Sequence, residues 1–164
     1  MSRKLVRIAF LAVVAVLVAG LPHDALAKKK KKGKVKATFS GKTVKLNRYV
    51  HIAGGGGTIA FQVLAQTKPR GQFYTLGVAC GQFPPLTVPG DLQFCSASLQ
   101  DTKTKGGYSS RMWLNLPGDT VVTIDSYDGQ QIAGRFSGEL DSLTGDPPLQ
   151  IEGEFRGPIV TAAQ

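Results

Sequence analysis

The sequence predicts an all-β fold, a single antiparallel β-sandwich or flattened barrel of about eight to ten strands. Three observations predict it. Apolar and polar residues alternate with a period of two in short runs along most of the chain. The 20 glycines and nine prolines fall largely between these runs, where turns need them. No stretch after Ala27 shows the period of an amphipathic helix.

The first segment has the three parts of a secretory signal peptide. Three positive side chains precede the apolar stretch Ile8–Leu21, and Ala25–Ala27 supplies the small residues that a signal peptidase needs before its cut. The apolar stretch is shorter than the ~20 residues that a membrane-spanning helix needs. We therefore expect residues 1–27 to be removed. The rest of the chain would be exported to the periplasm, the envelope or the medium.

Residues 28–36 are predicted to form a disordered, lysine-rich tail, because they contain almost nothing apolar to bury. Positive charge close behind an apolar stretch opposes translocation. An uncleaved anchor, with the domain held inside the cell, is therefore the alternative. The lysines of the tail are Lys28, Lys29, Lys30, Lys31, Lys32, Lys34 and Lys36.

The formal net charge of +9 belongs to the leader and the tail. Residues 37–164, the predicted β domain, hold equal numbers of acidic and basic residues. Specific nucleic-acid binding is therefore not expected. The tail is instead predicted to be an exposed polycation that is attracted to anionic envelope surfaces. The alternative is a solvated spacer without a selected partner.

Each alternating run is expected to be a strand with one apolar face. The residues of these faces are Val35, Ala37 and Phe39; Ile59, Phe61 and Val63; Tyr74, Leu76, Val78 and Cys80; Tyr108, Ser110, Met112, Leu114 and Leu116; Ile132, Gly134, Phe136, Gly138 and Leu140; and Leu149, Ile151, Gly153 and Phe155.

The last two runs are predicted to form a hairpin in one particular register. With Leu140 opposite Leu149, three further pairs follow: Phe136 with Gly153, Gly134 with Phe155, and Arg135 with Glu154. In this register each ring covers a glycine on the neighbouring strand, and the outward charges are opposite.

This hairpin, residues 132–155, resembles the C-terminal hairpin of small exported bacterial β-sandwich proteins of unknown function. The residues that carry the likeness are 132–140, a loop rich in proline, glycine and aspartate, and 151–155. The resemblance implies a fold type and a compartment. It implies no active-site residue.

Cys80 and Cys95 are expected to form a disulfide, because an exported chain with an even number of cysteines usually pairs them. The segment between them contains several prolines and is expected to be an irregular connection. A redox or metal-binding pair would need a much closer spacing.

Groups suited to catalysis are scarce after the signal. His51 is the one histidine there, and we expect it at the sheet surface as an ordinary strand residue rather than as a general base. Carboxylates Glu139, Glu152 and Glu154 are expected on a solvated strand face rather than as a glycosidase pair. No cofactor and no metal is predicted.

Several loops superficially resemble binding motifs. Gly54–Gly57 lacks the Lys-Ser/Thr of a phosphate loop, and no helix is expected to follow it. Asp125 and Asp128 lack the spacing of a calcium loop. Residues 141–148 are predicted to form a solvated loop. All of these are expected to be plain turns.

Trp113 is predicted to point outward beside Arg111, away from Met112 and Leu114. An exposed tryptophan would suggest contact with a partner protein, a carbohydrate or another subunit. The alternative is a ring that lies under a loop or over neighbouring strand residues.

The favoured function is therefore that of an exported, non-catalytic β domain, which acts as a binding or structural protein of the envelope. The alternative is a carrier that holds a small apolar ligand in the cavity of a closed barrel. A hydrolase is the third hypothesis.

Overall fold

The computed structural model describes residues 33–54, 61–68, 70–81 and 89–161, which form strands and no helix. This confirms the all-β prediction. The strands are β1 (Lys34–Phe39), β2 (Lys42–Lys45), β3 (Arg48–Gly54), β4 (Phe61–Gln66), β5 (Gln72–Cys80), β6 (Gly90–Lys103), β7 (Ser109–Leu114), β8 (Thr120–Tyr127), β9 (Gln131–Ser142) and β10 (Leu149–Thr161).

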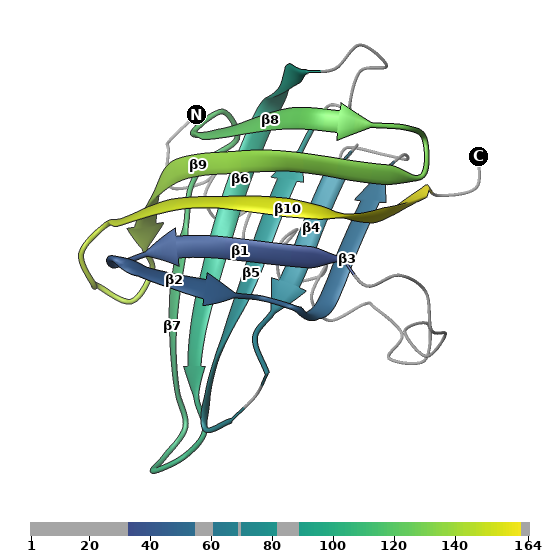
Figure 1. Cartoon of the computed structure of the whole chain (residues 1–164). Coiled ribbons are helices and arrows are strands. Elements are labelled where there is room, and N and C mark those ends of the chain that lie inside the picture. Colours follow the sequence, from purple (N-terminus) through teal and green to yellow (C-terminus); the bar gives the residue numbers. More distant parts are fainter. Residues whose placement is uncertain (1–32, 55–60, 69, 82–88, 162–164) are drawn as a thin grey trace. The chain divides into compact units, whose positions relative to one another are not determined.

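The strands belong to one mixed sheet in the order β2-β1-β10-β3-β4-β5-β6-β7-β9-β8, with further pairings of β10 with β9 and of β6 with β8. The sheet bends into two layers. In Figure 1, β8, β9, β10, β1 and β2 run across the front, and β3 to β7 cross steeply behind them. The core lies between the layers.

Strand β10 links the two layers. Its residues 149–158 pair with β9, and residues 151–156 pair with β1 on the other side. Beyond the end of β1, Ile159 lies opposite Ile52 of β3, and this pairing is parallel. The expectation of a purely antiparallel sheet is wrong at this one junction, because β10 is longer than β1 and reaches a strand that runs in its own direction.

Strand β6 makes a second link. Residues 95–103 pair with β5, whereas residues 90–95 pair with β8 of the front layer. A bulge between Leu92 and Cys95 turns the strand from one layer to the other. Phe94 lies in this bulge with a φ of 55° and is largely exposed.

The predicted register of the hairpin β9–β10 is confirmed in every pair, from Leu140 with Leu149 to the outward pair Arg135 with Glu154. Gly134 and Gly153 are required because the rings opposite them leave no room for a Cβ atom. A Cβ atom on Gly134 would lie 2.7 Å from Cζ of Phe155, and one on Gly153 would collide with Phe136 and with the carbonyl of Lys36.

The inward side chains pack as one cluster. The expected inward faces of β1, β5, β9 and β10 are confirmed by their buried apolar residues. The rings of Phe61 and Phe155 lie 5.7 Å apart in the middle, and Phe39 meets Tyr74 edge-on at 5.0 Å. The interior at these places is therefore filled by side chains.

Two strands that contribute to this cluster were not predicted. The connection after the prolines was expected to be irregular, yet Gly90–Lys103 is the longest strand of the sheet. Its bulge interrupts the period of two, and its serines, glutamines and alanines are weak strand signals. Strand β8 likewise contains a bulge, between Ile124 and Ser126.

Cys80 and Cys95 form the expected disulfide, with an S–S distance of 2.11 Å. They are directly opposite each other on β5 and β6. The bond therefore joins the end of β5 to the place where β6 turns toward the front layer.

Gly153→Ala should lower the free energy of unfolding by about 2 to 3 kcal/mol, since the new methyl group must displace the Phe136 ring. Urea unfolding followed by Trp113 fluorescence measures this. Ser137→Ala, on the outward side of the same hairpin, should change stability by less than about 0.5 kcal/mol. Equal effects of the two substitutions would show that the ring does not need the glycine.

Candidate surface-binding site

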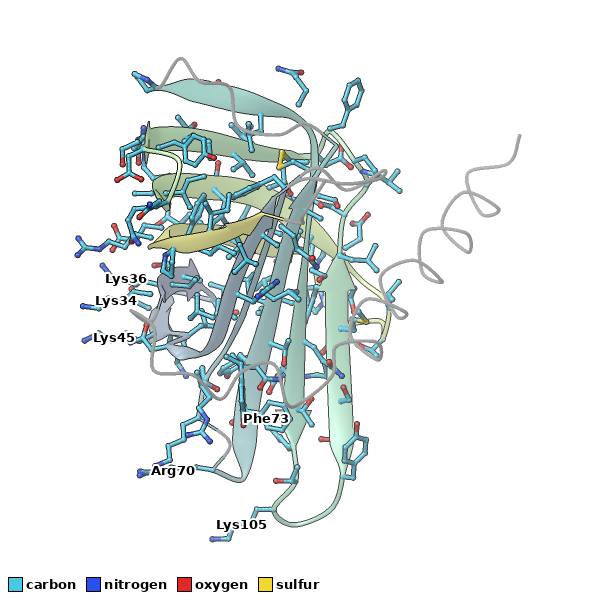
Figure 2. The ribbon with its side chains drawn as sticks, turned by 90° about the vertical axis from the view of Figure 1, so that its right-hand side faces the viewer. Lys34, Lys36, Lys45, Arg70, Phe73 and Lys105 are labelled. Carbon is cyan, nitrogen blue, oxygen red and sulfur yellow. A yellow bond between two sulfur atoms is a disulfide. The ribbon has the colours of Figure 1, made fainter. Side chains whose placement is uncertain are left out.

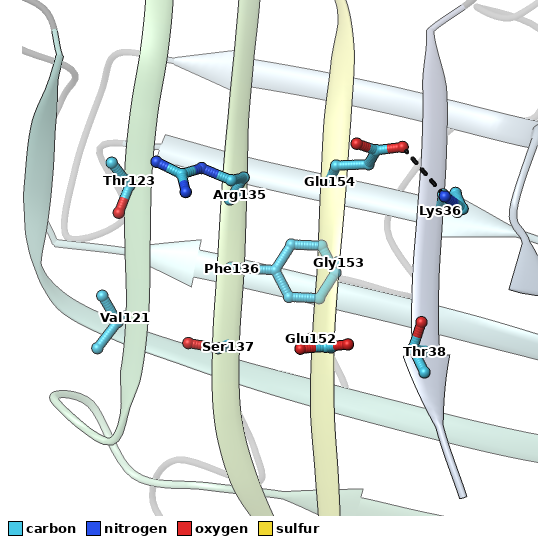
Figure 3. Close-up of a pocket in the computed structure, with 10 residues that line it drawn as sticks. All are labelled: Lys36, Thr38, Val121, Thr123, Arg135, Phe136, Ser137, Glu152, Gly153 and Glu154. Atoms are coloured by element: carbon cyan, nitrogen blue, oxygen red, sulfur yellow. Dashed lines mark ion pairs between the residues drawn. The ribbon is translucent and has the colours of Figure 1, made fainter. Parts of the chain in front are cut away.

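The outward face of the front layer is built from rows of mainly polar side chains across paired strands. One row consists of Thr123, Arg135, Glu154, Lys36 and Lys45, from β8 to β2. The next consists of Val121, Ser137, Glu152, Thr38 and Thr43. Between the rows lies a shallow groove of about 370 Å³ (Figure 3).

The β9 and β10 part of this face is largely neutralised by local partners. Arg135 bonds Asp125 at 3.0 Å, and the side-chain amide of Gln150 donates to Glu139. Lys36 reaches Glu154 at 3.6 Å. All these side chains are exposed, so each ion pair contributes at most about 1 kcal/mol.

Lys34, Lys36 and Lys45 form what we call the basic strip. They lie on the adjacent strands β1 and β2, with Lys36 directly opposite Lys45. Figure 2 shows all three side chains extending to the same side of the molecule. No described residue forms an ion pair with Lys34 or Lys45, so the strip keeps most of its positive charge on the surface.

Local sequence explains why the strip forms. Ser40 and Gly41 both have positive φ, 48° and 69°, as the central residues of a two-residue hairpin turn do. This turn sets Lys45 opposite Lys36, because the outward positions of the two strands then coincide. The turn signal in the sequence could have revealed Lys45, which sequence reasoning missed.

The predicted tail is shorter than expected. Lys34 and Lys36 belong to β1, where the intervening Val35 is buried in the core, so the last residues of the range 28–36 are not a tail. Lys28 to Lys32 lie outside the described residues. In sequence they lead directly into the basic strip.

The structure does not support an outward Trp113. Its side chain is 6 % exposed and belongs to the core, and its indole N–H donates to the carbonyl of Pro147 at 3.1 Å. Trp113 pairs with the inward Leu99 of β6, so Met112 and Leu114 face outward instead. The alternative of a ring beneath a loop is the correct one, and Trp113 offers no surface contact.

Arg111 lies opposite Asp101 of β6, and its charge is paired within the chain. Its guanidinium bonds the carboxylate of Asp101, which is 2 % exposed, at 2.6 Å, and that of Asp146 at 3.4 Å. It also lies 5.2 Å above the Trp113 ring. Gln72 donates a further hydrogen bond to Asp101 at 2.8 Å.

This cluster ties the β9–β10 loop to the other layer. The hydrogen bond to Asp101 raises the pKa of Arg111 further above its ordinary value. Hydrogen bonds from Thr144 and Arg111 hold the pKa of Asp146 below its ordinary value. Every charged group in the cluster is thus satisfied from within it. We call this cluster the latch, because it joins the β9–β10 loop to β6 and β7.

The remaining sequence candidates are separate from one another. His51 lies on the outward side of β3 opposite Leu64, and partial burial lowers its pKa. Asp128 accepts hydrogen bonds from the backbone N–H groups of Gln130 and Gln131, which makes a plain turn. Residues 55–57 lie outside the described part. Among the described residues, no group of three or more potential ligands could hold a metal ion.

Searches of protein-family models, curated proteins and solved structures gave no match to this chain. Within the described residues, no helix is long and apolar enough to cross a membrane.

Arg111→Met should lower the free energy of unfolding by about 2 kcal/mol, because it leaves the Asp101 carboxylate buried with one remaining side-chain donor. Chemical unfolding measures the loss. Arg135→Met removes an exposed pair of the same kind and should cost less than about 1 kcal/mol. If both variants lose the same small amount, the latch does not contribute to stability.

Proposed function

We propose that the protein is an exported, non-catalytic β domain that binds anionic envelope surfaces through the lysine segment and the basic strip. The observation that carries the proposal is the position of Lys34, Lys36 and Lys45 on one outward surface, directly after the lysine run in the sequence. The run and the strip can therefore face one anionic surface together.

Electrostatics gives this arrangement a useful affinity. A lysine near an anionic membrane contributes about 1 kcal/mol at low salt. Lysines held on two paired strands lose little conformational freedom of the backbone when they bind, whereas a tail must be ordered. The attraction should weaken as salt shortens the Debye length to ~8 Å at physiological ionic strength.

Export is supported by two independent features. The signal-like segment precedes the lysines, and the Cys80–Cys95 bond is compatible with an oxidising compartment. The envelope offers phospholipid head groups and acidic polysaccharides as anionic surfaces. The proposed site recognises negative charge density, which phospholipid head groups and acidic polysaccharides both provide.

We further infer that the bent sheet is a flattened barrel with a filled interior. The pairing of β10 with both β9 and β3, and of β6 with both β5 and β8, supports closure of the sheet. The contact of Phe61 with Phe155 and the single cluster of inward side chains favour a solid core. These features support a surface-binding domain over a carrier of apolar ligands.

The test is binding of the exported protein to vesicles of phosphatidylglycerol and phosphatidylcholine. The triple variant Lys34→Gln, Lys36→Gln, Lys45→Gln should bind at least about tenfold more weakly at low salt. Neutral phosphatidylcholine vesicles should not bind either protein, and added salt should reduce the difference between them.

A matched triple variant controls for net charge. Lys68, Lys103 and Lys105 are exposed lysines outside the strip, and their change to glutamine removes the same charge. This control should retain nearly full binding. An equal loss in both triple variants would mean that only the total charge matters, and the strip would then not be a site.

A further inference from the structure

The outward face of the second layer differs sharply from that of the front layer. It is formed by the outward side chains of five neighbouring strands, β3 to β7. They are His51 and Ala53; Gln62, Leu64 and Gln66; Phe73, Thr75, Gly77 and Ala79; Ser96, Ser98, Gln100 and Thr102; and Ser110, Met112 and Leu114. We call this set the neutral face.

None of these residues carries a formal charge, and the charged Arg48 lies at the β3 edge of the same side, opposite Gln66. The one histidine of the neutral face is His51, and burial lowers the pKa of this side chain, which favours the neutral form. A solvated surface normally carries charged residues at about a quarter of its positions or more. The front layer follows that rule, since its outward rows include Arg135, Glu154 and Lys36.

The neutral face is also flat at its centre. Gly77 lies between Leu64 and Ser98, and a Cβ on this glycine would come within 2.9 Å of the serine hydroxyl. Small side chains of this kind let a second sheet approach to about 10 Å. Met112 supplies apolar surface beside the centre, whereas Leu114 on the same strand is already buried.

We propose that the neutral face is where a second copy of this chain packs, back to back, to form a homodimer. The centre of the face carries no charge, so two identical copies meet no charge repulsion there, and Arg48 lies at the β3 edge. Its polar groups are mainly amides and hydroxyls, such as Gln66, Thr75 and Gln100, which both donate and accept hydrogen bonds. The face is therefore chemically complementary to itself, as a twofold interface requires.

The size of the face limits how much surface a dimer can bury. Five strands about 4.8 Å apart, with four outward positions along β5, cover on the order of 600 Å² in each copy. A standard protein interface buries about 800 Å² per partner, and crystal contacts mostly bury less than about 400 Å². The neutral face lies between them, so we expect a weak and reversible dimer.

A neutral polysaccharide is the competing occupant, since its hydroxyl groups also match amides. Sugar rings are usually held by exposed aromatic faces. Within the neutral face Phe73 is the one phenylalanine, tyrosine or tryptophan, and the exposed rings of Tyr49 and Phe94 lie outside its centre, at the irregular stretches of β3 and β6. A second copy is therefore the better fit.

Sedimentation velocity of the exported protein tests the proposal between about 1 and about 200 µM. A solution of about 0.5 M NaCl suppresses contacts made by the lysines, so the result is independent of the proposed surface binding. The wild type should shift reversibly from monomer to dimer across this range.

Gln100→Lys should weaken the dimer at least about a hundredfold, because it places an unpaired charge from each copy in the interface. Thr75→Lys, on the neighbouring strand, should do the same. Ser137→Lys is the matched control on the front layer and should leave the dimer unchanged. Near-ultraviolet circular dichroism of Trp113 should show that each variant is folded.

Three results would overturn the proposal. The first is a wild type that stays monomeric at the highest concentration, and the second is a Ser137→Lys variant that loses the dimer as strongly as Gln100→Lys. A monomeric wild type that is retained on an uncharged polysaccharide column, with retention lost in folded Gln100→Lys, would assign the face to a glycan instead.

Discussion

The structure depends on the contact of two phenylalanine rings with two glycines across β9 and β10. Phe136 occupies the space in which a side chain of Gly153 would lie, and Phe155 does the same at Gly134. Any shift by one residue would turn every side chain of β10 to the opposite face. The rings therefore fix the register of a strand that also pairs with β1 and β3.

That register determines what the front layer presents to solvent. Because Phe155 points inward, Glu154 points outward, and β1 places Lys36 opposite it. The turn at Ser40 and Gly41 then adds Lys45 to the same row. The basic strip is thus a consequence of core packing two strands away.

The two outward faces give the domain two different surfaces. One has alternating charges with a basic edge, and the other has no formal charge apart from Arg48 at its β3 edge. A back-to-back dimer would cover the neutral faces and leave both basic strips exposed on opposite sides. Such a dimer could bind two anionic surfaces at once, and each contact would increase the effective concentration of the other.

The sequence predicted those parts of the fold that depend on local pattern. The register of β9 and β10 followed from matching rings to glycines, and the disulfide followed from cysteine number and compartment. Strand β6 was missed because its bulge breaks the alternation. Trp113 was placed on the wrong face, since the apolar Met112 and Leu114 suggested the opposite orientation.

The candidate site was predicted only in part, for a similar reason. The lysines of the tail and of β1 were visible as a run in the sequence, but Lys45 joins them through a strand pairing. The neutral face was not visible at all, because it collects residues from five consecutive strands whose relative register is not set by any one short segment.

The central claim is that the front layer meets an anionic surface with its β1–β2 edge. Lysine acetylation of the exported protein, with and without phosphatidylglycerol vesicles, tests it residue by residue by mass spectrometry. We predict that vesicles slow the modification of Lys34, Lys36 and Lys45 severalfold, while Lys68, Lys103 and Lys105 react at unchanged rates. Equal slowing at all six positions, or no slowing in the strip, would contradict the account.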